Sequence, residues 1–83
     1  MRNTKIVGKF RLLNTEQRPD GYNDYMVIKR YQADLQVGNE IYKNGAMKCV
    51  IEYKGTRRSK GFKGEVAHHD LERWINETIG FVF

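Results

Sequence analysis

The chain contains little cysteine, little proline and no long apolar run, and each shortage excludes a class of protein. Its 83 residues include one cysteine, Cys49, so no disulfide can form within the chain. Small secreted domains commonly depend on several disulfides. No stretch of about 20 apolar residues could span a membrane, and the cationic start of the chain lacks the apolar run of a secretion signal. We therefore expect a cytosolic (cytoplasmic) protein with no membrane partner.

The residues that are present are typical of one folded domain. Hydrophobic residues make up 40% of the chain, which is enough apolar surface to argue against disorder. A chain of this length has no room for a second core, so 1–83 is expected to be a single domain.

The chain is also basic, with a formal net charge of +5. A positive potential of this size favours encounters with nucleic acid, a ribonucleoprotein or an acidic protein surface. Solubility is an equally good reason for such a charge. The distribution of the cations along the chain is therefore more informative than their number.

Alternating apolar and polar residues predict that the fold begins with a strand. Ile6, Phe10 and Leu12 share one parity and cations occupy the other, so a half-buried strand is expected near 5–13. Residues 14–24 show no period and contain Pro, Asp, Gly and Asn, which favour turns. We expect a surface loop over this range.

Further strands follow in the same kind of pattern. Apolar residues at every second position predict strands over 25–37 and 47–54. A polar turn is expected at 55–59, after which 60–66 returns as another strand.

Two dipeptides between the longer strands are typical of tight turns. They are Gly38-Asn39 and Asn44-Gly45, of which the second suits a type I′ turn better. Two turns this close together leave two alternatives for 40–43. The segment is either a short strand or part of one longer connection.

The period changes from two to 3.6 residues after 66, which predicts an amphipathic helix. Its apolar face is marked by residues at helical spacing, namely Ala67, Leu71, Trp74, Ile75 and Thr78. Gly80 stands where a helix commonly ends, at the C′ position. The apolar residues 81–83 are expected to dock on the core or to extend the sheet.

The predicted fold is α+β, an antiparallel sheet of about four strands with one amphipathic C-terminal helix packed on one face. Strands joined by hairpins cannot form a parallel sheet, which needs crossover connections. Cys49 and Trp74 are expected in the core. The sheet face without the helix is left to water or to a partner.

The strongest functional signal is a dense group of cations around the predicted turn at 55–59. Five cations fall within ten residues, accompanied by glycines and one aromatic ring: Lys54, Arg57, Arg58, Lys60 and Lys63, with Phe62. Guanidinium groups, ammonium groups and accessible backbone N–H groups are what phosphate binding requires. An exposed turn that is merely soluble and charged is the alternative.

A second basic group is expected on the first strand and near the second. It contains Lys5, Lys9 and Arg11, with Lys29, Arg30 and Lys48 nearby if the strands pair as predicted. With Tyr31 or Tyr42 on the same face, these cations would form a basic and aromatic surface suited to nucleic acid. Tyrosines in short strands are more often part of sheet packing.

The pair His68-His69 does not predict a metal site, because three or four converging ligands are needed and the one cysteine lies elsewhere. We expect no metal and no cofactor. Glu65, a histidine of this pair and Arg57 or Arg58 could serve a small ribonuclease, although their spacing does not single this out. We therefore expect a protein that is not an enzyme.

Two family resemblances appear in the order strand, basic turn, strand and helix. Residues 47–76, with Arg57-Arg58-Ser59-Lys60-Gly61-Phe62 followed by Leu71 and Trp74, resemble the arm-binding N-terminal domains of phage and transposon integrases. That resemblance implies that Arg57, Arg58 and Lys60 contact DNA. Here more residues separate Phe62 from Trp74 than is usual in that family.

The whole chain also resembles the very small α+β proteins that phages and mobile elements direct against their hosts, including anti-CRISPR proteins. The likeness is in size, hairpin-rich order and the helix segment 71–75. Many anti-CRISPR proteins are acidic mimics of DNA, which a charge of +5 excludes for this chain. The resemblance implies an inhibitor that binds a protein, or RNA exposed on a complex.

The leading hypothesis is thus a non-enzymatic phage-type inhibitor or accessory protein that docks on a host protein or ribonucleoprotein. The alternative is a sheet-based module that binds DNA or RNA, and the third hypothesis is a toxin-like ribonuclease. Pairing of an exposed sheet edge with a second copy would give a homodimer in place of a monomer.

Overall fold

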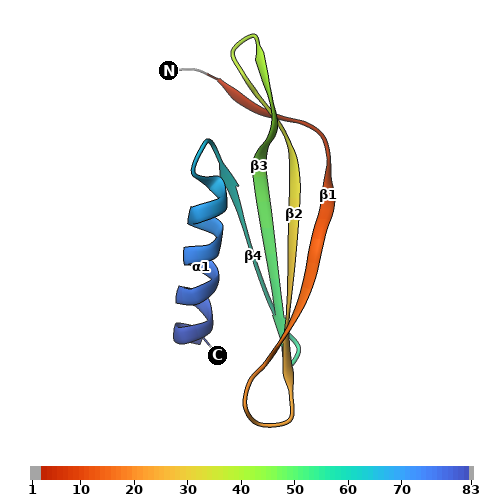
Figure 1. The fold of residues 1–83 in the computed structure, drawn as a ribbon, viewed down its shortest axis with the longest axis vertical. Helices are drawn as coiled ribbons and strands as arrows, with labels where there is room; N and C mark the ends of the chain where they lie inside the picture. The colour runs from red at the N-terminus through yellow and green to blue at the C-terminus, as the bar shows by residue number, and fades with distance from the viewer. Residues whose placement is uncertain (1–2, 83) are drawn as a thin grey trace.

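The computed structural model describes residues 3–82, which form four strands and one helix (Figure 1). The strands pair antiparallel with their neighbours in chain order: β1 (Thr4–Pro19), β2 (Tyr25–Val37), β3 (Glu40–Tyr53) and β4 (Thr56–Lys63). The helix α1 (Ala67–Val82) lies along β3 and β4 on one side of this sheet. The α+β arrangement predicted from the sequence is confirmed.

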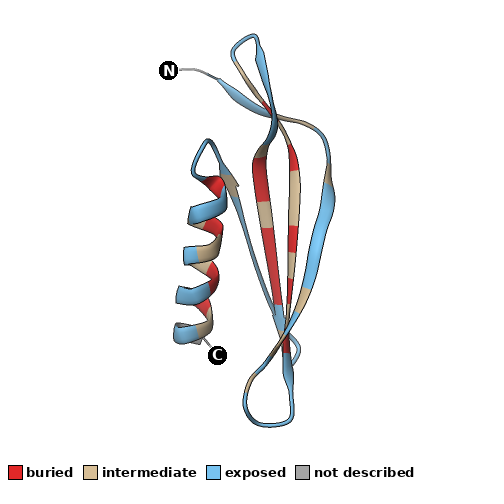
Figure 2. Cartoon of the chain, in the orientation of Figure 1, coloured by how far each residue is buried: buried red, intermediate tan, exposed pale blue. Residues whose placement is uncertain are grey.

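The main core lies between α1 and the two central strands (Figure 2). Ile28 of β2 and alternate residues of β3 face the helix, which contributes one apolar side chain per turn. The buried members of the main core are Ile28, Met47, Cys49, Ile51, Ala67, Leu71 and Ile75. Burying an aliphatic side chain of this size stabilises a fold by about 1.5–3 kcal/mol. The predicted helix face and the buried position of Cys49 are both confirmed.

A smaller apolar cluster stabilises the end of the sheet nearest the turn between β2 and β3. It contains buried Ala33, Leu35 and Ala46, against which Ile6 and Phe10 of β1 pack. Ala33 pairs with Ala46 in the register, one position beyond Met47. Because successive strand residues point to opposite faces, this cluster lies on the face away from α1.

The loop predicted over 14–24 is wrong for most of its length. β1 continues to Pro19, which pairs with Tyr25, and only residues 20–24 connect the strands. The register shifts between Val7 and Arg11 and again at Leu13, which indicates two bulges. The first shift inserts two residues and leaves the alternation in phase, whereas the shift at Leu13 inserts one residue and reverses the faces of all later residues. The single period expected of a strand is therefore lost after Leu13.

The turn predicted at Asn44-Gly45 is also wrong, because β3 runs through it without a break. The chain turns at Gly38-Asn39, and 40–43 belongs to the strand. Asn44 instead has a positive φ of 60° within a bulge opposite Asp34. The Asp34 carboxylate accepts the Asn44 backbone N–H at 3.1 Å, so the bulge has its own side-chain support.

Two other boundaries differ from prediction. The turn after β3 consists of Lys54 and Gly55, both with positive φ, so the predicted turn residues from 56 onward belong to β4. The helix does not end at Gly80, since the backbone of residues 81 and 82 continues it and therefore does not extend the sheet. Docking of the 81–83 side chains, the other expectation, falls outside the described residues.

Within 3–82, no helix combines the length and apolar character needed to cross a membrane.

Candidate binding surface

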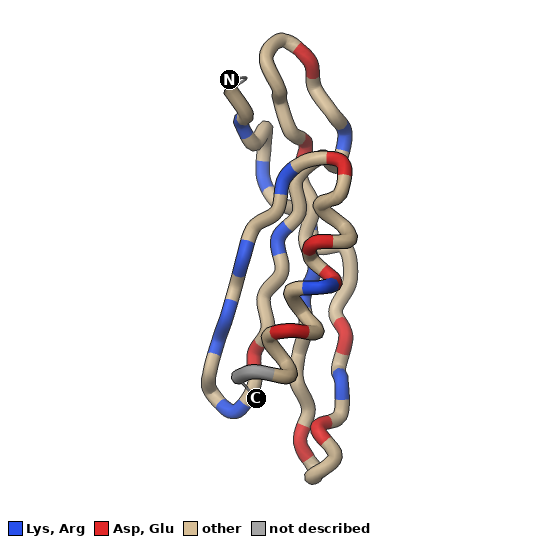
Figure 3. The backbone as a smooth tube through the Cα atoms, turned by 90° about the vertical axis from the view of Figure 1, so that its left-hand side faces the viewer, with Lys and Arg blue, Asp and Glu red and all other residues tan. Residues whose placement is uncertain are grey.

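The edge strand β4 gathers most of the cations predicted to bind a partner. Four of its eight residues are cationic and none is acidic (Figure 3). All four cations are exposed. We call them the β4 strip: Arg57, Arg58, Lys60 and Lys63. None of them forms an ion pair with a carboxylate of residues 3–82. The strip is therefore a row of unneutralised charge along one edge of the sheet.

The register distributes the β4 strip over both faces of that edge. Arg58 pairs with Ile51 and Lys60 with Cys49, so both side chains start on the face that carries α1. Arg57 and Lys63 start on the opposite, open face. An anionic chain that follows β4 can thus be contacted from two sides.

The helix side of the strip includes two aromatic rings. Phe62 and Trp74 lie edge to face with ring centroids 6.1 Å apart, and the Lys60 Nζ atom lies 5.6 Å from the Phe62 centroid. Phe62 is half-buried and packs against the main core. The predicted aromatic neighbour of the cations is therefore in place, but it also has a structural role.

The open face extends the positive surface inward from the edge. Lys29, Tyr31 and Lys48 lie on this face in the register of the central strands. The Lys48 Nζ atom lies 5.9 Å from the centre of the Phe10 ring, and Lys29 pairs with Glu52 at 4.0 Å. Lys29 and Lys48, which the sequence places near the second basic group, thus lie on the open face.

Lys54 differs from the rest of the predicted cluster because local groups already engage it. Hydrogen bonding to Tyr53 raises the pKa of Lys54, and the carboxylates of Asp20 and Asp24 add electrostatic attraction. Its Nζ atom lies 5.2 Å from the centre of the Tyr53 ring, and the Tyr53 hydroxyl donates to Asp20. Lys54 is thus engaged by Tyr53 and by carboxylates of the connection between β1 and β2, so we leave it out of the β4 strip.

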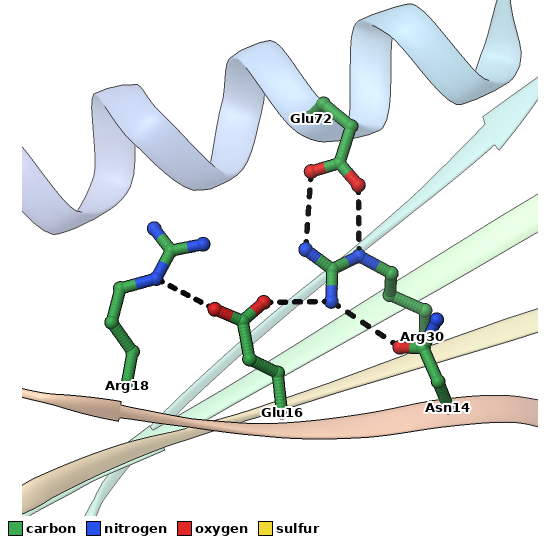
Figure 4. A network of polar contacts seen from close by, with 5 residues as sticks. All are labelled: Asn14, Glu16, Arg18, Arg30 and Glu72. Atoms are coloured by element: carbon green, nitrogen blue, oxygen red, sulfur yellow. Dashed lines mark hydrogen bonds and ion pairs between the residues drawn. The ribbon is translucent and has the colours of Figure 1, made fainter.

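The expectation that Arg30 lies on an exposed binding surface is wrong. Arg30 is 7% exposed and lies between the sheet and α1, where its guanidinium is surrounded by acceptors (Figure 4). Its Nε and Nη2 atoms donate to the two carboxylate oxygens of Glu72 at 2.9 and 3.1 Å. Its Nη1 atom contacts Glu16 at 3.0 Å and Asn14 at 3.2 Å. The guanidinium is therefore engaged within the molecule and does not lie on a binding surface.

The other predicted cations of β1 do not join the β4 strip. Arg11 donates to Asp34 at 3.2 Å and to Asn44 at 2.9 Å, so it supports the bulge in β3. Lys9 is exposed within the first bulged segment of β1. Since β1 and β4 are the two opposite edges of the sheet, these residues form a separate surface.

The histidine pair and Cys49 offer no site in the described part of the chain. His68 and His69 are exposed at the start of α1, and their ring centroids lie 5.9 Å apart. Residues 3–82 contain no group of three or more His, Cys, Asp or Glu side chains that could hold a metal ion. Burial raises the pKa of the Cys49 thiol to about 11, so the reactive thiolate is disfavoured.

Comparisons of the chain with protein families, with characterised proteins and with solved structures find no match. A proposal about function must therefore come from the surface itself. Sequence reasoning assigned Trp74 to the core alone, whereas the structure also places it beside the β4 strip. Its position on the edge of the apolar helix face, next to Arg73, was the available signal.

Proposed function

We propose that this chain is a non-enzymatic binding protein that contacts the phosphate backbone of nucleic acid along β4. The observation that carries the proposal concerns the arginines. Of the six that the structure describes, four form ion pairs with carboxylates, and the other two are Arg57 and Arg58 of the β4 strip. Arginine is the side chain best suited to phosphate, and these two remain available for it.

The dimensions of the strip fit a polyanion better than a single small anion. Arg57 and Lys63 are six positions apart, which corresponds to roughly 20 Å of extended strand. A strand of duplex DNA presents one phosphate about every 3.4 Å along its axis, so several phosphates fall within this length. As an edge strand, β4 also presents backbone N–H groups, which commonly contact phosphates.

The charges of the helix and of β4 favour the approach of a polyanion from the sheet edge. The helix contains three carboxylates, Asp70, Glu72 and Glu77, and one arginine, whereas the charged residues of β4 are all cationic. Asp70 pairs with Arg73 and Glu72 with Arg30, whereas no cation of the β4 strip pairs with a carboxylate of residues 3–82. A phosphate backbone is therefore attracted more strongly to the sheet edge than to α1. This asymmetry is what a solubilising charge scattered over the surface would lack.

Fluorescence anisotropy of a labelled 12-mer oligonucleotide at low salt tests the proposal. We expect Arg57→Ala with Arg58→Ala to weaken binding by roughly tenfold or more, because two charge-assisted contacts are lost. The matched control is Lys5→Ala with Lys9→Ala, which removes the same charge from the opposite edge. Equal losses in the two variants, or no binding by the unmodified protein, would contradict the proposal.

A second candidate function is a phage-type inhibitor that docks on a host protein or ribonucleoprotein. The observation that favours it is the hairpin of β2 and β3, which extends past the N-terminal first turn of α1 (Figure 1) and exposes Ile41 to 62% and Tyr42 to 44%. A pull-down from bacterial lysate, with and without nuclease, tests this candidate. It requires a stoichiometric partner that survives nuclease and is lost with Ile41→Asp but retained with the β4 double variant.

A further inference from the structure

Trp74 lies between two hollows that open on either side of it, between β4 and α1. The first is lined by Arg57, Arg58, Ser59, Lys60, Trp74 and Thr78. The second is lined by Lys60, Phe62, Asp70, Arg73, Trp74 and Glu77. Trp74 and Lys60 belong to both, so an indole ring and an ammonium group form the ridge between them.

The indole of Trp74 is shared between the core and the solvent. It packs against the main core, yet Trp74 is only half-buried, whereas Leu71 and Ile75 on the same helix face are fully buried. Part of the ring is thus left beside a row of cations. Its contacts with the core and with the Phe62 ring hold the indole in a fixed orientation.

The two hollows together form a groove between β4 and α1. We propose that this groove binds an unpaired base of single-stranded nucleic acid, which stacks against Trp74 while Arg58 and Lys60 hold the adjacent phosphates. The inference rests on the proposed function and specifies its ligand. An aromatic ring beside cations is the usual arrangement for single strands, since every base has a face that stacks. Bases within a duplex are already stacked and paired, so their faces are not accessible to an indole.

The two hollows differ in charge, which fixes how the strand lies. The hollow at Arg57 and Arg58 is lined by cations and contains no carboxylate. The hollow at Phe62 includes Asp70 and Glu77, and Asp70 is already paired with Arg73. In the second hollow Lys60 and Arg73 balance the two carboxylates, whereas the first hollow is purely cationic. Phosphates are therefore attracted to the first hollow in preference to the second, so the backbone follows β4 and the base turns toward the helix.

The fluorescence of Trp74 can report this contact directly, because it is the one tryptophan of the chain. The unmodified protein is titrated at low salt with three polyanions: a single-stranded 12-mer of thymidine, its duplex with the adenosine 12-mer, and inorganic polyphosphate. Binding of each is measured separately by competition with a labelled oligonucleotide. Stacking of a base on the indole quenches its emission, whereas phosphate contacts alone leave the ring uncovered.

We expect saturable quenching by the single strand and little change with the duplex or polyphosphate, although all three bind. The variant Trp74→Leu keeps an apolar side chain for the core and removes the stacking surface. It should weaken binding of the single strand by about tenfold and leave that of polyphosphate unchanged, with circular dichroism as the check on folding.

The possible outcomes separate this inference from the proposed function. Binding of all three polyanions with no quenching, or with equal quenching by all three, overturns the stacking proposal and leaves the β4 strip as a phosphate site. Absence of binding by any of them overturns both. The titration of the unmodified protein decides the matter even if Trp74→Leu does not fold.

Discussion

The guanidinium of Arg30 and the carboxylate of Glu72 meet through two hydrogen bonds, although 42 positions separate them in the sequence. Together with Glu16 this pair links β1, β2 and α1 in one network (Figure 4). Apolar packing fixes how deeply the helix sits on the sheet, and a directional pair of this kind fixes its rotation. The position of Trp74 beside β4 depends on that rotation.

Removal of the Arg30 guanidinium should therefore be costly. We expect Arg30→Met to lower the free energy of unfolding by about 2 kcal/mol, because the carboxylates of Glu16 and Glu72 lose their partner at the edge of the core. Urea denaturation measures this. The matched control is Arg73→Met, whose exposed pair with Asp70 should contribute no more than about 0.5 kcal/mol. Equal effects of the two variants would contradict the account.

Stability should decline in acid, and Glu16 should be one cause. Hydrogen bonding to Arg18, aided by Arg30, lowers the pKa of Glu16 below its ordinary value of 4.5. A carboxyl of this kind stabilises the fold fully above its ordinary pKa, and the contribution is lost as the pH falls through the folded value. Urea denaturation at about pH 6 and about pH 3 should show a smaller acid loss for Glu16→Gln than for the unmodified protein. An identical loss would show that Glu16 has no part in it.

Cys49 should be inert in the folded protein. Burial raises the pKa of its thiol to about 11, and its side chain lies in the main core. Labelling with a disulfide reagent near pH 8 should therefore be slow in buffer and rapid in urea, since the thiolate is the reactive species. The chain has no other cysteine that could obscure the signal. Rapid labelling of the folded protein would be inconsistent with this core.

Two glycine variants test the boundaries that the sequence predicted incorrectly. Gly80→Ala should stabilise the protein by about 0.5 kcal/mol, because Gly80 lies within the helix and an added methyl group meets open space. The same change at a helix C′ glycine would destabilise the protein instead.

Gly45→Ala should destabilise the protein by about 1–3 kcal/mol, because the new Cβ would lie 2.9 Å from the Cβ atom of Leu35. Thermal unfolding of both variants measures these effects.

The sequence predicted the elements that follow one uninterrupted period. α1 and the middle of β3 keep their periods, so Leu71, Ile75 and Cys49 were assigned correctly to the core. β1 was cut short because the one-residue bulge at Leu13 shifts its alternation, and a bulge depends on the partner strand.

The candidate site was predictable only in part. Clustering in the sequence identified Arg57 and Arg58, although it placed them in a turn where the structure has a strand. Arg30 was assigned to an exposed surface, because its partner Glu72 lies on an element far away in the sequence. Whether a cation is free or paired depends on such long-range contacts, which composition and spacing do not show.

The salt dependence of oligonucleotide binding tests the central claim that the β4 strip contacts phosphates. The logarithm of the binding constant for a single strand should fall linearly with the logarithm of salt concentration, with a slope near −0.7 for each phosphate contacted. Four cations predict a slope of about −3, and Arg57→Ala with Arg58→Ala should reduce its magnitude to about 1.4. A slope near zero, or one that the double variant leaves unchanged, would contradict the account.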